Sequence, residues 1–185
     1  MKYAICTGLL FVSAAAFAQT TGGVSSEWDV RKLLEDLDRG TQQLKPVIEQ
    51  VQPQAWVAKG APEAYVQQWR TAQDELKYLL SSSENLAKQP DRLPLALDTY
   101  FRMQAMESTF GSVIEGIRKY QNPALADLVH AFVAENGTNR DRLRQYIQDL
   151  ATQKEQEFKV ADREAQRCRG ALVQQDSKER KPAHK

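Results

Sequence analysis

Residues 65–86 read YVQQWRTAQDELKYLLSSSENL, and this stretch decides the fold class. Its apolar and small side chains recur at alternating steps of four and three residues. Such a stripe marks one face of an α-helix that packs along a neighbouring helix. The stretch therefore predicts a long helix with a continuous packing face, formed by Tyr65, Trp69, Ala72, Leu76, Leu79, Ser83 and Leu86.

The segment that follows, residues 93–120, repeats this pattern after a turn signal at Pro90 and Asp91. Gly111 and Gly116 lower its intrinsic helix stability without breaking the spacing. We expect a second long helix here, with a buried face made of Leu93, Leu97, Tyr100, Met103, Met106, Phe110, Val113, Ile117 and Tyr120.

The segment from Ser26 to Val51 lies before both of these stretches and predicts another helix. Its apolar residues recur from Val30 onward. Pro46 interrupts it without changing the phase of the stripe, which predicts a kink rather than a stop. The connection from Pro53 to Pro62 is expected to hold one turn of helix around residues 55–59.

The last helix is expected to begin at Asn122 and Pro123, which suit the cap and first-turn positions. Gly137 could end this helix, with Thr138 capping another. The four-and-three spacing continues through Gly137, however, which favours one long helix, straight or kinked. Asn136 and Asn139 fall on its buried stripe and could form a polar layer that fixes pairing register. Beyond the bundle the stripe thins to Leu150, Phe158, Ala161, Ala165, Cys168 and Leu172, so the distal end should project.

The chain has 185 residues, of which 42% are hydrophobic and 26% charged, the size and balance of one packed domain. No segment alternates with the period of two expected of strands. The predicted fold is all-α: an elongated antiparallel up-down four-helix bundle over residues 26–174, with a long C-terminal helix.

The N-terminal residues 1–18 have the pattern of a secretory signal peptide. A positive start precedes an apolar stretch, and Ala16 and Ala18 frame a small-residue cleavage site. An uncleaved anchor is the alternative interpretation. We expect cleavage after Ala18, a flexible leader over residues 19–25, and an exported product, periplasmic or extracellular.

Charge is divided along the remaining chain. Residues 19–162 hold 17 basic and 21 acidic side chains, whereas residues 163–185 hold 7 basic and 3 acidic ones. Residues 175–185 are therefore expected to form a basic disordered tail. Without interleaved aromatic residues this tail offers no stacking platform, so no nucleic-acid partner is expected.

Removal of Cys6 with the signal peptide would leave Cys168 as the single thiol. An odd cysteine in an exported protein indicates an intermolecular disulfide, a mixed disulfide or a free thiol. Arg167 and Arg169 favour its reactive thiolate form, although Cys168 could instead pack as a small apolar side chain. A homodimer through the C-terminal helix, locked by a Cys168 to Cys168 disulfide, is the sharpest hypothesis.

Other candidates for chemistry are weaker. His130 with Met103 and Met106 could supply axial ligands to haem, although methionines on an apolar stripe usually fill the core. Asp127 and His130 share a helix face, as in one half of a di-metal site, but a second pair is missing. No resident cofactor or metal is expected. The chain also contains no H-E-x-x-H, G-x-S-x-G or phosphate-binding glycine motif, so we expect no enzymatic activity.

Trp56, in the connection between two helices, is a candidate for an exposed partner contact, because binding residues concentrate in loops. A cap over the open end of the bundle is the alternative. Taken together, the sequence predicts an exported, non-enzymatic interaction or scaffold protein that binds a protein partner, with self-association the simplest case. The alternative function is a ligand-, haem- or metal-binding bundle.

Overall fold

The computed structural model describes residues 27–179, with side chains from 29 to 176. This part of the chain forms α-helices and no strand, so the all-α prediction is confirmed. The signal peptide and leader predicted for residues 1–25 lie outside the described residues. The helices are α1 (Glu27–Ile48), α2 (Pro53–Val57), α3 (Ala64–Lys88), α4 (Leu93–Tyr120) and α5 (Pro123–Glu179).

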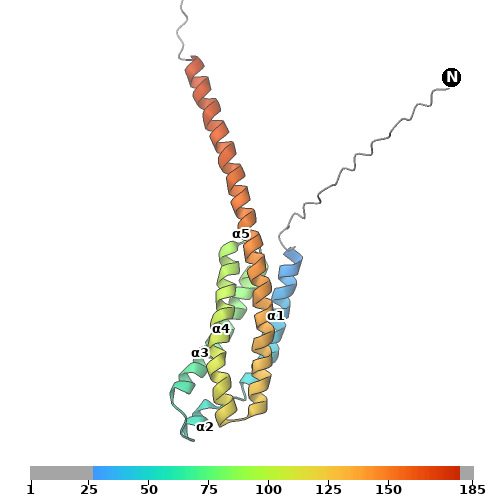
Figure 1. Cartoon of the computed structure of the whole chain (residues 1–185), viewed down its shortest axis with the longest axis vertical. Helices are drawn as coiled ribbons and strands as arrows, with labels where there is room; N and C mark the ends of the chain where they lie inside the picture. The colour runs from blue at the N-terminus through green and yellow to red at the C-terminus, as the bar shows by residue number, and fades with distance from the viewer. Residues whose placement is uncertain (1–26, 180–185) are drawn as a thin grey trace, which may run out of the picture.

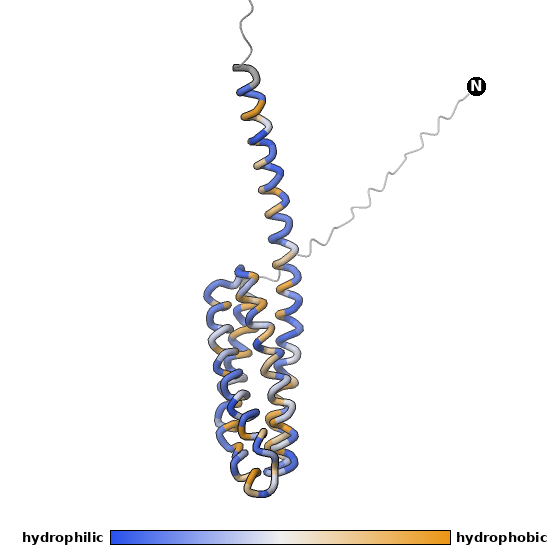
Figure 2. Tube along the Cα trace, turned by 90° about the vertical axis from the view of Figure 1, so that its left-hand side faces the viewer, coloured by the Kyte–Doolittle hydropathy of each residue, from blue (hydrophilic) through white to orange (hydrophobic). Residues whose placement is uncertain are grey.

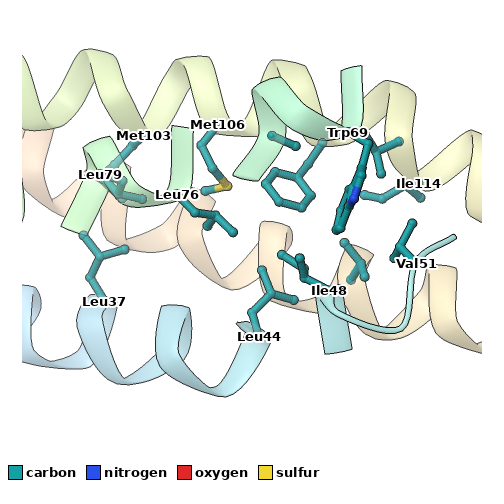
Figure 3. Close-up of a cluster of buried hydrophobic side chains, with 14 of the residues drawn as sticks. Leu37, Leu44, Ile48, Val51, Trp69, Leu76, Leu79, Met103, Met106 and Ile114 are labelled. Atoms are coloured by element: carbon teal, nitrogen blue, oxygen red, sulfur yellow. The ribbon is translucent and has the colours of Figure 1, made fainter. Parts of the chain in front are cut away.

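Four of these helices are long and lie side by side (Figure 1). α1 contacts α3 and α5, while α4 contacts the same two helices from the other side. One hydrophobic core fills the space between them, because the apolar face of each helix is buried against its neighbours. Figure 3 shows Leu37, Leu79, Met103 and Met106 from three different helices meeting in this core.

The buried face of α3 is the one that the sequence predicts. Trp69, Ala72, Leu76, Leu79, Ser83 and Leu86 are all buried, and Tyr65 is partly buried. The face of α4 is predicted correctly from Met103 to Ile117 but not before it. There the structure buries Ala96 and Thr99 in place of their larger neighbours Leu97 and Tyr100.

The difference in α4 arises from close packing against α3. The Thr99 hydroxyl lies 3.2 Å from the Ser82 carbonyl oxygen and 3.0 Å from the Leu95 carbonyl oxygen, both of which can accept its proton. Only small side chains allow the two backbones to approach this closely. Periodicity predicts the spacing of the buried residues of α4 correctly. Choosing the larger side chains as the buried ones assigns the wrong face of the helix before Met103.

α1 continues through Pro46 but ends two residues later, at Ile48. Proline cannot donate a backbone hydrogen bond, and the chain then tightens into turns in which Gln50 and Val51 donate to carbonyls three residues back. The expected continuation to Val51 is therefore wrong. The turn of helix predicted near residues 55–59 is present as α2, shifted towards Pro53.

α5 is one helix of 57 residues, and it passes through Gly137 without a break. Asn122 caps it as expected, because its side-chain oxygen accepts a 2.9 Å hydrogen bond from the Ala124 N–H. The helix is described to Glu179, whereas the predicted bundle domain ends at residue 174 and the predicted tail begins at residue 175. Residues 180–185 lie outside the described residues.

Trp56 closes one end of the core. Its side chain is 1% exposed, so the expectation of an exposed position is wrong and the capping alternative holds. Its indole N–H donates a 3.0 Å hydrogen bond to Oε1 of Gln121, in the connection between α4 and α5. The same oxygen accepts from the Gln52 N–H, while Gln121 Nε2 donates to the Gln50 carbonyl. The side-chain amide of Gln121 thus connects α2 to the C-terminal end of α4.

The Trp56 ring packs edge-on against Tyr65 and stacks on Tyr120. Gly116 leaves the space that this cluster occupies: a Cβ atom there would lie 2.7 Å from Trp56 and 2.9 Å from Tyr65. Gly116 lowers the intrinsic stability of the α4 helix, but the Trp56 cluster requires it.

Gly116→Ala is expected to lower the free energy of unfolding by about 1–3 kcal/mol, because the added methyl group must displace two aromatic rings. Gly111→Ala is the matched control: the same helix gains the same methyl group in open space. It should raise stability by about 0.5–1 kcal/mol through helix propensity. Urea unfolding of both variants measures this, and equal effects would contradict the proposed role of Gly116.

Candidate functional site

The distal half of α5 is the most unusual surface of the described chain. Figure 1 shows it continuing well beyond the ends of the other long helices. All residues from Glu155 to Asp176 are exposed. Four large hydrophobic side chains are nevertheless found there, Phe158, Val160, Leu172 and Val173, with exposed fractions between 46% and 72%. Figure 2 shows this part of α5 as a largely hydrophilic helix with scattered apolar positions.

Two of these residues, Phe158 and Leu172, lie on a face of their own, whereas Val160 and Val173 fall outside it. The buried stripe of α5 ends at Leu150, and its continuation would fall on the polar residues Gln153 and Glu157. Beyond Leu150 the small and apolar positions come one residue later, which turns the stripe by about 100° around the helix axis. The new face, here called the distal stripe, consists of Ala151, Lys154, Phe158, Ala161, Ala165, Cys168 and Leu172.

The prediction that the bundle stripe continues outward is therefore wrong in phase. A stripe that only thinned would keep pointing along the bundle core, whereas the distal stripe faces a different direction. Its steps of three and four residues are those of a helix that pairs with another helix. No helix of the described chain covers it.

Cys168 lies on the distal stripe and is exposed and free of any disulfide within the described residues. Cys6 lies outside them. Among the described residues Cys168 belongs to no group of three or more metal-binding side chains, so its accessibility is the property on which any role depends.

The residues considered for haem are not brought together. His130 is exposed on α5, whereas Met103 and Met106 are both 0% exposed inside the core. The methionines pack beside Leu76 and Leu79 (Figure 3), which is the core-filling role considered from the sequence. The surface cavities between α1 and α5 and between α1 and α3 are lined by none of these three residues.

The residues considered for a metal are also placed apart from other ligands. Asp127 lies on the surface and forms a 2.9 Å ion pair with Arg118. Within the described residues, no group of three or more histidine, cysteine, aspartate or glutamate side chains could hold a metal ion. Among the same residues, no helix is both long and apolar enough to cross a membrane.

A polar layer does cross the buried face of α5. Asn136 and Asn139 are 2% and 8% exposed, as their positions on the stripe predict. Nδ2 of Asn136 has no hydrogen-bond partner, which is costly for a buried amide. The Asn136–Thr138 sequence matches a glycosylation acceptor, but a side chain buried in a packed helix cannot take a glycan.

Two carboxyl groups near the bundle interior have perturbed pKa values. Burial raises the pKa of Glu107, against the opposing effect of Arg140, with which it forms an ion pair between α4 and α5. Burial also raises the pKa of Asp38 on α1. The neighbouring Ser83 hydroxyl opposes this shift, and the Glu84 carboxylate adds to it.

Comparisons with protein-family models, curated protein sequences and solved structures found no match to this chain. The candidate site is accordingly defined by geometry alone: an exposed helix with its own apolar face.

Asp38→Asn is expected to stabilise the fold at pH 7 and to have little effect at pH 3.5. The raised pKa of Asp38 means that its contribution to stability is largest below its unfolded value, near 4, and is lost as the pH rises through the folded value. Urea unfolding at both pH values measures the change. Asp36→Asn is the control, because it removes ion pairs to Lys32 and Arg39 and should slightly destabilise at pH 7. A loss of stability in Asp38→Asn at pH 7 would contradict the expectation.

Proposed function

We propose that this chain is an exported, non-enzymatic interaction protein: an antiparallel up-down four-helix bundle whose distal α5 helix binds a partner helix, with self-association as the simplest case. The distal stripe carries this proposal. Polar residues dominate the exposed faces around it, yet an apolar seam with coiled-coil spacing runs through them.

The bundle supports the proposal because it holds the base of the distal helix in a fixed position. Two short connections join α3 to α4 and α4 to α5, as expected for antiparallel neighbours. At the end from which α5 projects, the Tyr146 hydroxyl donates a 2.7 Å hydrogen bond to the Pro90 carbonyl. This bond fixes the base of the distal helix against the connection between α3 and α4.

The energetics of an exposed helix also favour a partner. Isolated helices are marginal in water, because most helical stability in proteins comes from packing an apolar face. Distal α5 instead has surface ion pairs such as Lys154–Glu157 and Lys159–Glu155, which contribute little each. Pairing would bury Phe158 and Leu172 and supply the missing packing.

Export is proposed from residues 1–18 alone. When the chain is expressed with these residues in a host with a secretory pathway, the intact mass of the exported product should match a chain beginning at Gln19. A product that retains Met1 and stays membrane-bound would support the uncleaved anchor instead.

Phe158→Ser is expected to weaken self-association about 100-fold. A buried phenylalanine contributes roughly 1.5 kcal/mol or more, and a symmetric dimer loses two of them, about 3 kcal/mol in total. Sedimentation equilibrium of the full chain over a range of concentrations measures the dimer dissociation constant.

Phe101→Ser is the matched control, since Phe101 is similarly exposed, at 59%, but lies on α4 within the bundle. It should leave the dissociation constant unchanged. An unmodified chain that stays monomeric at every concentration would refute self-association. Equal weakening by both substitutions would place the interface elsewhere.

A further inference from the structure

We infer that the partner of the distal stripe is the distal stripe of a second copy, in antiparallel orientation, with Ala165 facing Cys168 of the partner subunit. This inference rests on the proposed self-association and specifies its geometry. The symmetry axis would pass between residues 166 and 167.

The length of the projecting helix favours this alignment. From Ala151 to Glu179 the helix extends about 40 Å beyond the core, at 1.5 Å per residue. In the inferred register residue 154 lies opposite residue 179, so the projecting parts of the two described helices overlap over almost their whole length. A shift of one heptad towards the bundle would place residue 179 opposite residue 147, beside helices that already occupy that space. A shift the other way would place Phe158 opposite residue 182, outside the described residues, and would shorten the overlap between the two described helices.

Side-chain size favours the same arrangement. Antiparallel pairing places Leu172 against the partner's Ala161 and Phe158 against the partner's Gln175, so neither large apolar side chain meets another of its kind. Parallel pairing would stack Phe158 on Phe158 of the partner subunit and Ala161 on Ala161 of the partner subunit. Two large side chains would hold the helices apart in one layer, and two small ones would leave a gap in the next. The two helices could then not pack evenly along their length.

Charge distinguishes the two orientations as well. Parallel pairing places Lys154 against Lys154 of the partner subunit within the seam, which is unfavourable. In the antiparallel register Lys154 lies at the C-terminal end of the partner helix, where the helix dipole favours a cation. Asp162 then flanks the partner's Arg169, twice in the dimer. Glu155 near Asp176 of the partner subunit is an opposing, like-charged contact that also occurs twice. All four positions are exposed and screened, so the position of Lys154 is the charge that separates the two orientations.

One consequence concerns the thiol. Directly opposite Cα atoms of a helix pair lie closer together than the helix axes, because each Cα is about 2.3 Å from its own axis. The two Cys168 residues are not directly opposite but are offset by ~4.5 Å along the axis, which lengthens their Cα separation. A disulfide needs Cα atoms less than about 7 Å apart. The dimer is therefore non-covalent, in place of the disulfide-locked dimer that the sequence suggests.

Disulfide trapping tests the register in the full chain. Cys6→Ser and Cys168→Ser are made in every variant, and single cysteines are then introduced by Ala161→Cys, Leu172→Cys or Ala165→Cys. Each variant is oxidised alone and in mixtures, and the products are identified by intact mass. Sedimentation equilibrium of the same samples before oxidation gives their oligomeric state.

The Ala161→Cys and Leu172→Cys variants should each remain unlinked alone and form a mixed disulfide dimer when combined. The mixture of Ala161→Cys with Ala165→Cys is the control, because it reports a register shifted by one heptad. The Cys6→Ser variant, in which Cys168 is the single thiol, should give no disulfide dimer.

A dimer that links one single variant to itself, or links Cys168 to Cys168, would overturn the register. Self-links at both 161 and 172 would overturn the antiparallel orientation, because only parallel pairing places each of these positions opposite itself. A link between positions 161 and 165, or a dimer without the 161 to 172 link, would overturn the register. These results leave the proposed self-association intact. A monomer in sedimentation would overturn both.

Discussion

The structure depends on one constraint: α5 is a single unbroken helix, but its packed core stops at Leu150. The first half of the helix forms one side of the bundle and fixes the direction of the second half. The second half begins from a helix that is already nucleated, so it avoids the cost that keeps isolated helices from forming. It obtains no packing of its own within the chain, and its apolar face points away from the core. The need to cover that face links the fold to the proposed function.

The remainder of the bundle supports this helix at both ends. At one end, Gln121 and Trp56 close the core and join α2 to the connection between α4 and α5. At the other, Tyr146 bonds to Pro90 next to the point where α5 leaves the bundle. Between them the core contains buried polar groups, including Thr99, Asn136 and Asn139. Such groups cost stability where they lack partners, and they limit the ways in which neighbouring helices can slide.

The sequence predicted where the helices run better than it predicted which of their residues are buried. Continuous four-and-three spacing identified α3 and carried α5 correctly through Gly137, because hydrophobic phase persists where a local glycine signal is weak. The choice of Leu97 over Ala96 failed, since close helix packing selects small residues that a hydrophobicity pattern ranks low. Trp56 was misplaced because burial of a loop depends on Gln121, 65 residues away. The phase change after Leu150 is visible in the sequence, but only the burial of Leu150 identifies where one stripe ends and the next begins.

Amide hydrogen exchange as a function of protein concentration tests the central claim most directly. In a single chain the amides of residues 155–176 should exchange quickly, because an exposed helix opens easily, while those of Met103–Ile117 in the core are protected. As concentration rises and copies pair, we predict that protection grows in residues 155–176 and stays constant in the core. Protection of residues 155–176 that does not change with concentration, or that changes only within the bundle, would contradict the account.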